Sequence, residues 1–310
     1  MTGVVRTVAG DVPVARIALA HSHEHLLARP PADLAAAEPE LVLDDDAAAL
    51  RDLAAFGAAG GGLLVEATTI DYGRDVAGLA RLATASGVDI VATTGFNKGV
   101  YCRPFCEGRD PAALARAQIA EVDDAAEPRC GVVKFGTSLG RIEPWERVAA
   151  EAAAATHLAT GCPILTHTEA GTMAHEQLDL LAALGVREEA VILSHLDRAP
   201  DLDLHLSLIE RGATLSYDQL PKPKYGTAEP AIALLAELAG RGLADRVVVG
   251  GDLSRRSYFT GYGGTPGLGW LATTWRARLQ TALDALGLDG AAAARAIFTD
   301  APRRALAMRA

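Results

Sequence analysis

Six side chains that could bind a metal follow short apolar runs spread over most of the chain. Each run ends in the polar residue, and a loop comes next. The residues are His23 and His25 in HSHEHLL, Lys134 in GVVKFGTS, His167 in PILTHTEAGT, His195 in VILSHLD and Asp252 in VVVGGDLSRR. In a (β/α)8 barrel, catalytic residues come from the carboxyl ends of several different parallel strands. The pattern therefore predicts one metal site at one end of such a barrel.

Several of these residues have an ordinary structural role that they could fill instead. His23 and His25 share one face of a strand because alternate side chains point the same way, but His21 shares that face and competes for either role. Lys134, if buried, would lose its charge readily, and the neutral amine could take up CO2 to give a carbamate able to bridge two metals. Alternatively, it could pair with a buried carboxylate such as Glu66.

The remaining candidates are also ambiguous when taken one at a time. His167 and His195 could be hydrogen-bonded core residues, and Asp252 could be a helix N-cap. The whole set is a stronger signal than any one residue. The candidate ligands fall on the first, fourth, fifth, sixth and eighth expected strands, and chance is a poor explanation for all five.

Short β-rich runs alternate with longer Ala- and Leu-rich stretches along the chain. Strands are expected at 16–21, 63–68, 90–95, 131–136, 163–168, 190–195, 213–218 and 246–251, and helices at 45–59, 75–86, 111–126, 144–160, 172–184, 200–211, 228–242 and within 270–309. Eight β/α units predict an α/β fold, a single-domain (β/α)8 TIM barrel that spans residues 1–310. Segment 1–15, with its Gly10-Asp11 turn, is expected to form a hairpin that caps the barrel floor. A doubly wound open sheet is the alternative, but GAAGGG at 57–62 precedes a strand, whereas a dinucleotide fingerprint follows one.

The composition narrows the function classes. The net charge of −10 argues against a nucleic-acid partner, and no apolar stretch approaches the roughly 20 residues of a membrane span. Asp11 and Arg16 interrupt the apolar part of the N-terminal segment, so we do not expect a signal peptide. We therefore expect a cytoplasmic location. Four cysteines in 310 residues do not suggest a disulfide framework, and we expect them to be reduced thiols.

Six segments resemble the phosphotriesterase-related branch of the amidohydrolase superfamily: HEHLL, TTIDYGRD, KFGTS, THTEAGTMAHEQL, SHLDR and DAPRRAL. The resemblance implies a hydrolase with two divalent ions, of which zinc is expected and manganese or cobalt are alternatives. It implies that His23, His25 and Asp252 hold one ion, that His167 and His195 hold the other, and that carbamylated Lys134 (N6-carboxylysine) bridges both. A homodimer is expected on the same basis.

The chemistry follows from that implied centre. A hydroxide that bridges the two ions would attack a carbonyl or phosphoryl centre, and Asp252 would act as the catalytic proton shuttle. Asp197, two residues after His195, could support a ligand from outside the metal site, or it could be a solvated loop carboxylate.

Two basic loops follow the seventh and eighth expected strands. Barrel enzymes frequently bind phosphate there, so these loops predict a small anionic substrate, although solvated surface charge is the alternative. The candidate substrate-binding residues are Lys222, Lys224, Tyr225, Arg255, Arg256 and Tyr258, with Tyr262 nearby. Lys224-Tyr225 and Arg255 with Tyr258 resemble the subgroup that hydrolyses phosphorylated sugar lactones.

The first hypothesis is therefore a lactonase that opens a phosphorylated five-membered sugar lactone. Alternatives are a phosphotriesterase or general lactonase for neutral esters or organophosphates, and an amidase for small acidic N-acyl compounds. From a different class, an inactive barrel could bind a sugar phosphate as a sensor, but every expected ligand type is present in this chain.

Overall fold

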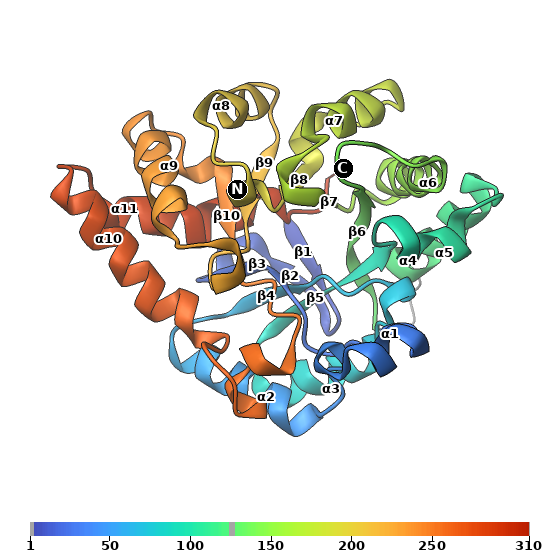
Figure 1. The fold of residues 1–310 in the computed structure, drawn as a ribbon, viewed down its shortest axis with the longest axis horizontal. Coiled ribbons are helices and arrows are strands. Elements are labelled where there is room, and N and C mark those ends of the chain that lie inside the picture. Colours follow the sequence, from blue (N-terminus) through green and yellow to red (C-terminus); the bar gives the residue numbers. More distant parts are fainter. Residues whose placement is uncertain (1–2, 124–127, 310) are drawn as a thin grey trace.

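Eight parallel strands form the centre of the molecule, and helices surround them (Figure 1). The structure is a computed structural model that describes residues 3–123 and 128–309. The strands pair in chain order: β3 (Ala20–Glu24), β4 (Leu63–Glu66), β5 (Asp89–Gly95), β6 (Cys130–Thr137), β7 (Ile164–Thr168), β8 (Val191–Ser194), β9 (Thr214–Tyr217) and β10 (Val247–Val249). The predicted single-domain (β/α)8 barrel is confirmed.

The first and last strands, β3 and β10, lie next to each other along a seam, where the barrel is nearly closed. The Ser22 hydroxyl donates to the Val249 carbonyl at 2.9 Å. Beyond the end of β10, the Asp252 amide donates to the His23 carbonyl at 2.9 Å. Two predicted ligand segments, which lie at opposite ends of the sequence, are therefore neighbours in space.

Most expected helices are present with small shifts at their ends. They are α2 (Asp46–Ala58), α3 (Val76–Ser86), α5 (Pro111–Asp123), α6 (Pro144–Thr160), α7 (Ala174–Ala183), α8 (Leu202–Glu210) and α9 (Glu229–Gly240); residues 124–126 of the expected 111–126 helix lie outside the described residues. The tail contains α10 (Arg276–Ala285), α11 (Gly290–Arg295) and α12 (Ala301–Ala305). Two further helices, α1 (Ala32–Ala37) and α4 (Gly99–Cys106), were not predicted. Both lie in loops that follow the carboxyl ends of strands.

The first barrel strand begins later than the expected position 16. The chain leaves the hairpin through a short 3-10 helix, Val14–Arg16, so pairing with β4 starts only at Ala20. The strand then continues to Glu24, which places His23 within it.

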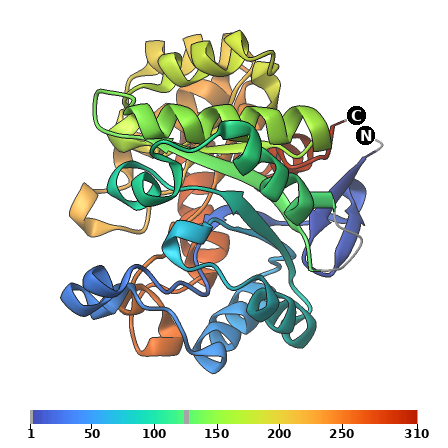
Figure 2. The same cartoon turned by 90° about the vertical axis from the view of Figure 1, so that its right-hand side faces the viewer.

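An antiparallel hairpin precedes the barrel and lies at one end of it (Figure 2). It consists of β1 (Val4–Thr7) and β2 (Gly10–Pro13), so the two turn residues are 8 and 9 rather than the expected Gly10-Asp11. Val5 packs in the same buried cluster as barrel-interior residues of β4, β5 and β6. The amide of Val8 also donates to the Ile90 carbonyl at 2.9 Å. These contacts support the proposal that the hairpin caps the barrel floor.

Candidate metal centre

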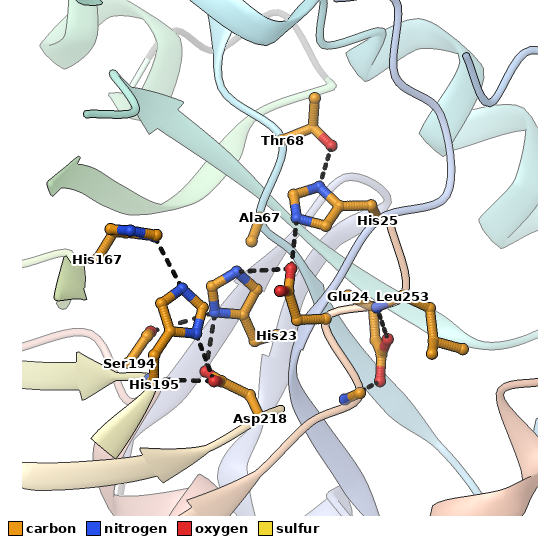
Figure 3. Close-up of polar contacts among 12 residues, drawn as sticks. His23, Glu24, His25, Ala67, Thr68, His167, Ser194, His195, Asp218 and Leu253 are labelled. Atoms are coloured by element: carbon orange, nitrogen blue, oxygen red, sulfur yellow. Dashed lines mark hydrogen bonds and ion pairs between the residues drawn. The ribbon is translucent and has the colours of Figure 1, made fainter. Parts of the chain in front are cut away.

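Four histidine side chains converge where the predicted ligand segments end (Figure 3). Nε2 of His195 lies 2.8 Å from Nδ1 of His167, and Nε2 of His25 lies 3.0 Å from Oδ1 of Asp252. His23 lies between these two pairs, because its ring centroid is 5.7 Å from that of His25 and 5.1 Å from that of His195. The strands thus bring all four histidines together with Asp252.

The ligating atoms of His23, His25 and Asp252 all lie within 4.8 Å of one another, close enough for one ion. Asp252 has a left-handed backbone with φ 43°, which is uncommon outside glycine. The carboxylate of Glu24 accepts from the amides on either side of it, Gly251 at 2.7 Å and Leu253 at 3.2 Å. Glu24 therefore clamps the turn that aims Asp252 at the two histidines.

Lys134 is buried in the middle of this group. Its Nζ lies 3.4 Å from His23 Nε2 and 3.1 Å from the carbonyl of Ala67. Burial lowers the pKa of this lysine, which favours the neutral amine that carbamate formation requires. The alternative pairing with Glu66 is absent, since that carboxylate accepts from the Leu26 amide and from the amide and hydroxyl of Thr68.

The protonation states suit a metal. Burial lowers the pKa of His23 to about 3 and that of His167 well below its ordinary value, so both rings are neutral near pH 7. Neutral imidazole is the form that binds metal. For Asp252, burial alone would raise the pKa, but the ammonium of Lys222 and the neighbouring histidines bring it well below the usual range. The donor set therefore fits divalent ions held by imidazole and carboxylate.

Asp218 is a central residue that the sequence analysis missed. Its two oxygens accept from Nδ1 of His23 at 3.0 Å and Nδ1 of His195 at 2.6 Å (Figure 3). These hydrogen bonds leave Nε2 of each ring facing the site. A carboxylate that does not bind the metal itself, here Asp218, commonly orients histidine ligands in this way. Asp197 acts one step further out, because it accepts from the amides of Asp218 and Gln219 at 3.3 and 2.9 Å.

The other histidines of the HSHEH segment differ in role. Nδ1 of His25 contacts the Thr68 hydroxyl at 2.7 Å, and that hydroxyl donates to Glu66. His21, the competing candidate, pairs with Glu24 at 2.9 Å and packs on Phe56. It does not line the cavity at the site, so its parity on the strand does not make it a ligand.

A cavity of about 230 Å³ opens above the four histidines. Of the predicted substrate-binding residues, Lys224, Tyr225 and Arg255 line it. Lys222 lines it too, but only 3% of this residue is exposed and its ammonium pairs with Asp252. The cavity also takes in Lys98, Glu169 and Arg198, which the sequence analysis did not select.

Arg256 and Tyr258 are not among the residues that line this cavity. Arg256 points to the first barrel loop, where it donates to the Val42 carbonyl at 2.7 Å and pairs with Asp44 at 2.8 Å. Tyr258 packs against the apolar core. The hydroxyl of Tyr262, also in that loop, accepts from the amides of Asp44 and Asp45. This part of the loop therefore holds the first barrel loop in place.

Comparison with known proteins identifies the family. The sequence pattern of the phosphotriesterase family matches residues 3–303. The chain belongs to the phosphotriesterase family. Members of this family are metal-dependent hydrolases of small molecules, so this protein is a hydrolase with candidate metal-binding groups at the expected place. No helix in the described ranges is long and apolar enough to cross a membrane.

Individual relatives agree with this assignment. The phosphotriesterase homology protein of Escherichia coli is 35% identical over 221 residues, which cover 70% of this chain and 75% of that protein. A phospho-furanose lactonase of Mycoplasmopsis synoviae is 28% identical over 282 residues, covering 84% and 80%. The crystal structure of a lactonase from Listeria monocytogenes superposes with a TM-score of 0.94 at 32% identity and covers 99% of this chain and all of that one.

Proposed function

We propose that this phosphotriesterase-family protein is a lactonase that opens a phosphorylated five-membered sugar lactone. The observation that carries the proposal is the cavity, in which Lys224 and Arg255 stand beside the histidine and aspartate cluster. A phosphate monoester is a good partner for such cations, since arginine offers a bidentate fork and lysine a point charge. The phospho-furanose lactonase among the relatives supports the same substrate class.

The residues could hold two divalent ions, one on His23, His25 and Asp252, the other on His167 and His195, with a carbamate of Lys134 between them. When bound, the ions would activate a water molecule and polarise the carbonyl of the ester.

The chain's own groups do the remaining work. Asp252, through its carboxylate, would accept a proton from the attacking water and deliver it to the ring oxygen that leaves as the alcohol. The side chains of Lys222 and His25 hold this carboxylate in place from either side. The product is a hydroxy acid that keeps its phosphate.

The test is acid release, followed with a pH indicator, from zinc- or manganese-loaded protein. Pentono-γ-lactones are offered in pairs, with and without a 5-phosphate. Preference for the phosphorylated member of each pair supports the proposal. Hydrolysis of only the neutral members would assign a general lactonase or phosphotriesterase instead, and hydrolysis of neither would direct the search to small acidic N-acyl compounds.

A further inference from the structure

The cationic side chains of the cavity differ in whether their charge is already neutralised. Lys134 belongs to the metal centre. Three others form ion pairs with carboxylates: Lys98 with Glu169, Lys222 with Asp252, and Arg255 with Glu38. An anionic substrate would have to compete with a protein carboxylate at each of these three positions.

Arg198 and Lys224 are the exceptions. Among residues 3–123 and 128–309, no carboxylate forms an ion pair or hydrogen bond with either side chain. Both lie against the ring of Tyr225, with Cζ of Arg198 3.7 Å and Nζ of Lys224 4.6 Å from its centroid. An aromatic face orients a cation and leaves its full charge and its N–H donors available.

The backbone places Arg198 close to the metal centre. It ends the 3-10 helix Leu196–Arg198, which follows β8 directly, and its amide donates to the His195 carbonyl at 3.1 Å. The backbone of His195, a predicted metal ligand, is thus hydrogen-bonded directly to the backbone of Arg198. Arg198 lines the cavity together with Lys224 and Tyr225.

We propose that Arg198, stacked on Tyr225 and joined by Lys224, binds the anionic group of the substrate and is the residue that makes the enzyme select a phosphorylated lactone. This inference rests on the proposed function. It adds Arg198, which follows the sixth barrel strand β8, to the substrate-binding residues expected in the loops after the seventh and eighth strands, β9 and β10. The guanidinium fork donates to two phosphate oxygens, and the ammonium of Lys224 supplies the second charge. Arg255 has a lesser part, because its guanidinium is held by Glu38 at 2.5 Å.

The test compares Arg198→Gln with a matched control, Arg103→Gln. Arg103 also stacks on an aromatic ring, with Cζ 4.6 Å from the centroid of Trp145, but it lies outside the cavity and pairs with Glu107. Arg198→Gln should raise KM for the 5-phosphorylated lactone by about tenfold or more, since a hydrogen bond to a charged group is lost. KM for the unphosphorylated lactone should change by less than about twofold, because that substrate lacks the phosphate.

Equal changes for both lactones, or no greater effect than in Arg103→Gln, would overturn the proposal. Lys224→Gln is a second variant for the same test, and it should also raise KM for the phosphorylated lactone.

A binding experiment separates this inference from the proposed function. Inorganic phosphate is titrated calorimetrically into the metal-loaded wild type, Arg198→Gln and Arg103→Gln. If the wild type hydrolyses no lactone, the proposed function fails, yet weaker phosphate binding confined to Arg198→Gln still supports an anion site at Arg198. Equal phosphate affinity in all three proteins would remove Arg198 from anion binding.

Discussion

Asp218→Asn tests whether one carboxylate organises both halves of the metal centre. In the wild type, Asp218 accepts from Nδ1 of His23 at 3.0 Å and from Nδ1 of His195 at 2.6 Å. Asparagine has one acceptor oxygen, so only one histidine can keep its hydrogen bond, and the other meets an NH2 donor. That ring must then change its tautomer, which removes the lone pair from Nε2 where the ligand is needed.

The size of the effect follows from the bond that is lost. A hydrogen bond to a charged group contributes about 1.5–3 kcal/mol, which corresponds to about 10- to 100-fold in metal affinity at one half of the site. Because Asp218 is fully buried, the variant should also unfold at a lower temperature.

The assay is a competitive titration of metal-free protein with zinc, accompanied by thermal unfolding. Asp52→Asn is the control, because Asp52 is equally buried and accepts from the amides of Thr260, Gly261 and Leu268, away from the histidines. The control should lose stability and keep metal affinity. A folded Asp218→Asn protein that binds two ions as tightly as the wild type would refute the reasoning.

Three further changes have expected outcomes. Asp252→Asn should keep the fold but lower kcat by about 10²- to 10⁴-fold through loss of the proton shuttle, and a near-normal kcat would exclude that role. Lys134→Ala should abolish binding of two metals, with bicarbonate unable to restore it; metal analysis that finds two ions would exclude the carbamate bridge. Burial raises the pKa of Asp71 from 3.8 to about 6, so the stability linked to its protonation is present below pH 3.8 and lost as the pH rises through 6. Asp71→Asn has no carboxyl group to ionise, so its free energy of unfolding should rise by about 2 kcal/mol relative to that of the wild type between pH 4 and pH 7. Urea unfolding measures this difference, and parallel pH curves would contradict it.

The barrel and the positions of the predicted ligands could be read from the sequence for one physical reason. Parallel strands buried on both faces appear as continuous apolar runs, so a polar residue at the end of such a run stands out. β6 is an example, since all eight residues of Cys130–Thr137 are buried and Lys134 is the charged one. The order of these runs then fixes which side chains share one end of the barrel.

Partners across the fold could not be read in this way. Asp218 stands at the end of a strand like the ligands do, yet only the structure shows that it faces two histidines rather than the cavity. Lys222 and Arg256 belong to the two basic loops, but each is paired with a carboxylate that is distant in the sequence. Lys222 pairs with Asp252, 30 positions away, and Arg256 pairs with Asp44, 212 positions away. Arg198 lies in SHLDR, but its stacking on Tyr225 of the next loop is visible only in the structure.

The seam between β3 and β10 also has a consequence for how the protein is made. His25 and Asp252 are 227 positions apart, so a growing chain presents His23 and His25 long before their carboxylate partner exists. Contacts of such long range form late in folding, because the intervening chain must first be ordered. The candidate site formed by His23, His25 and Asp252 is therefore complete only when the last strand has docked, and we expect tight metal binding only in the fully folded barrel. An ion bound there would then hold the two ends of the sheet together and oppose reopening of the seam.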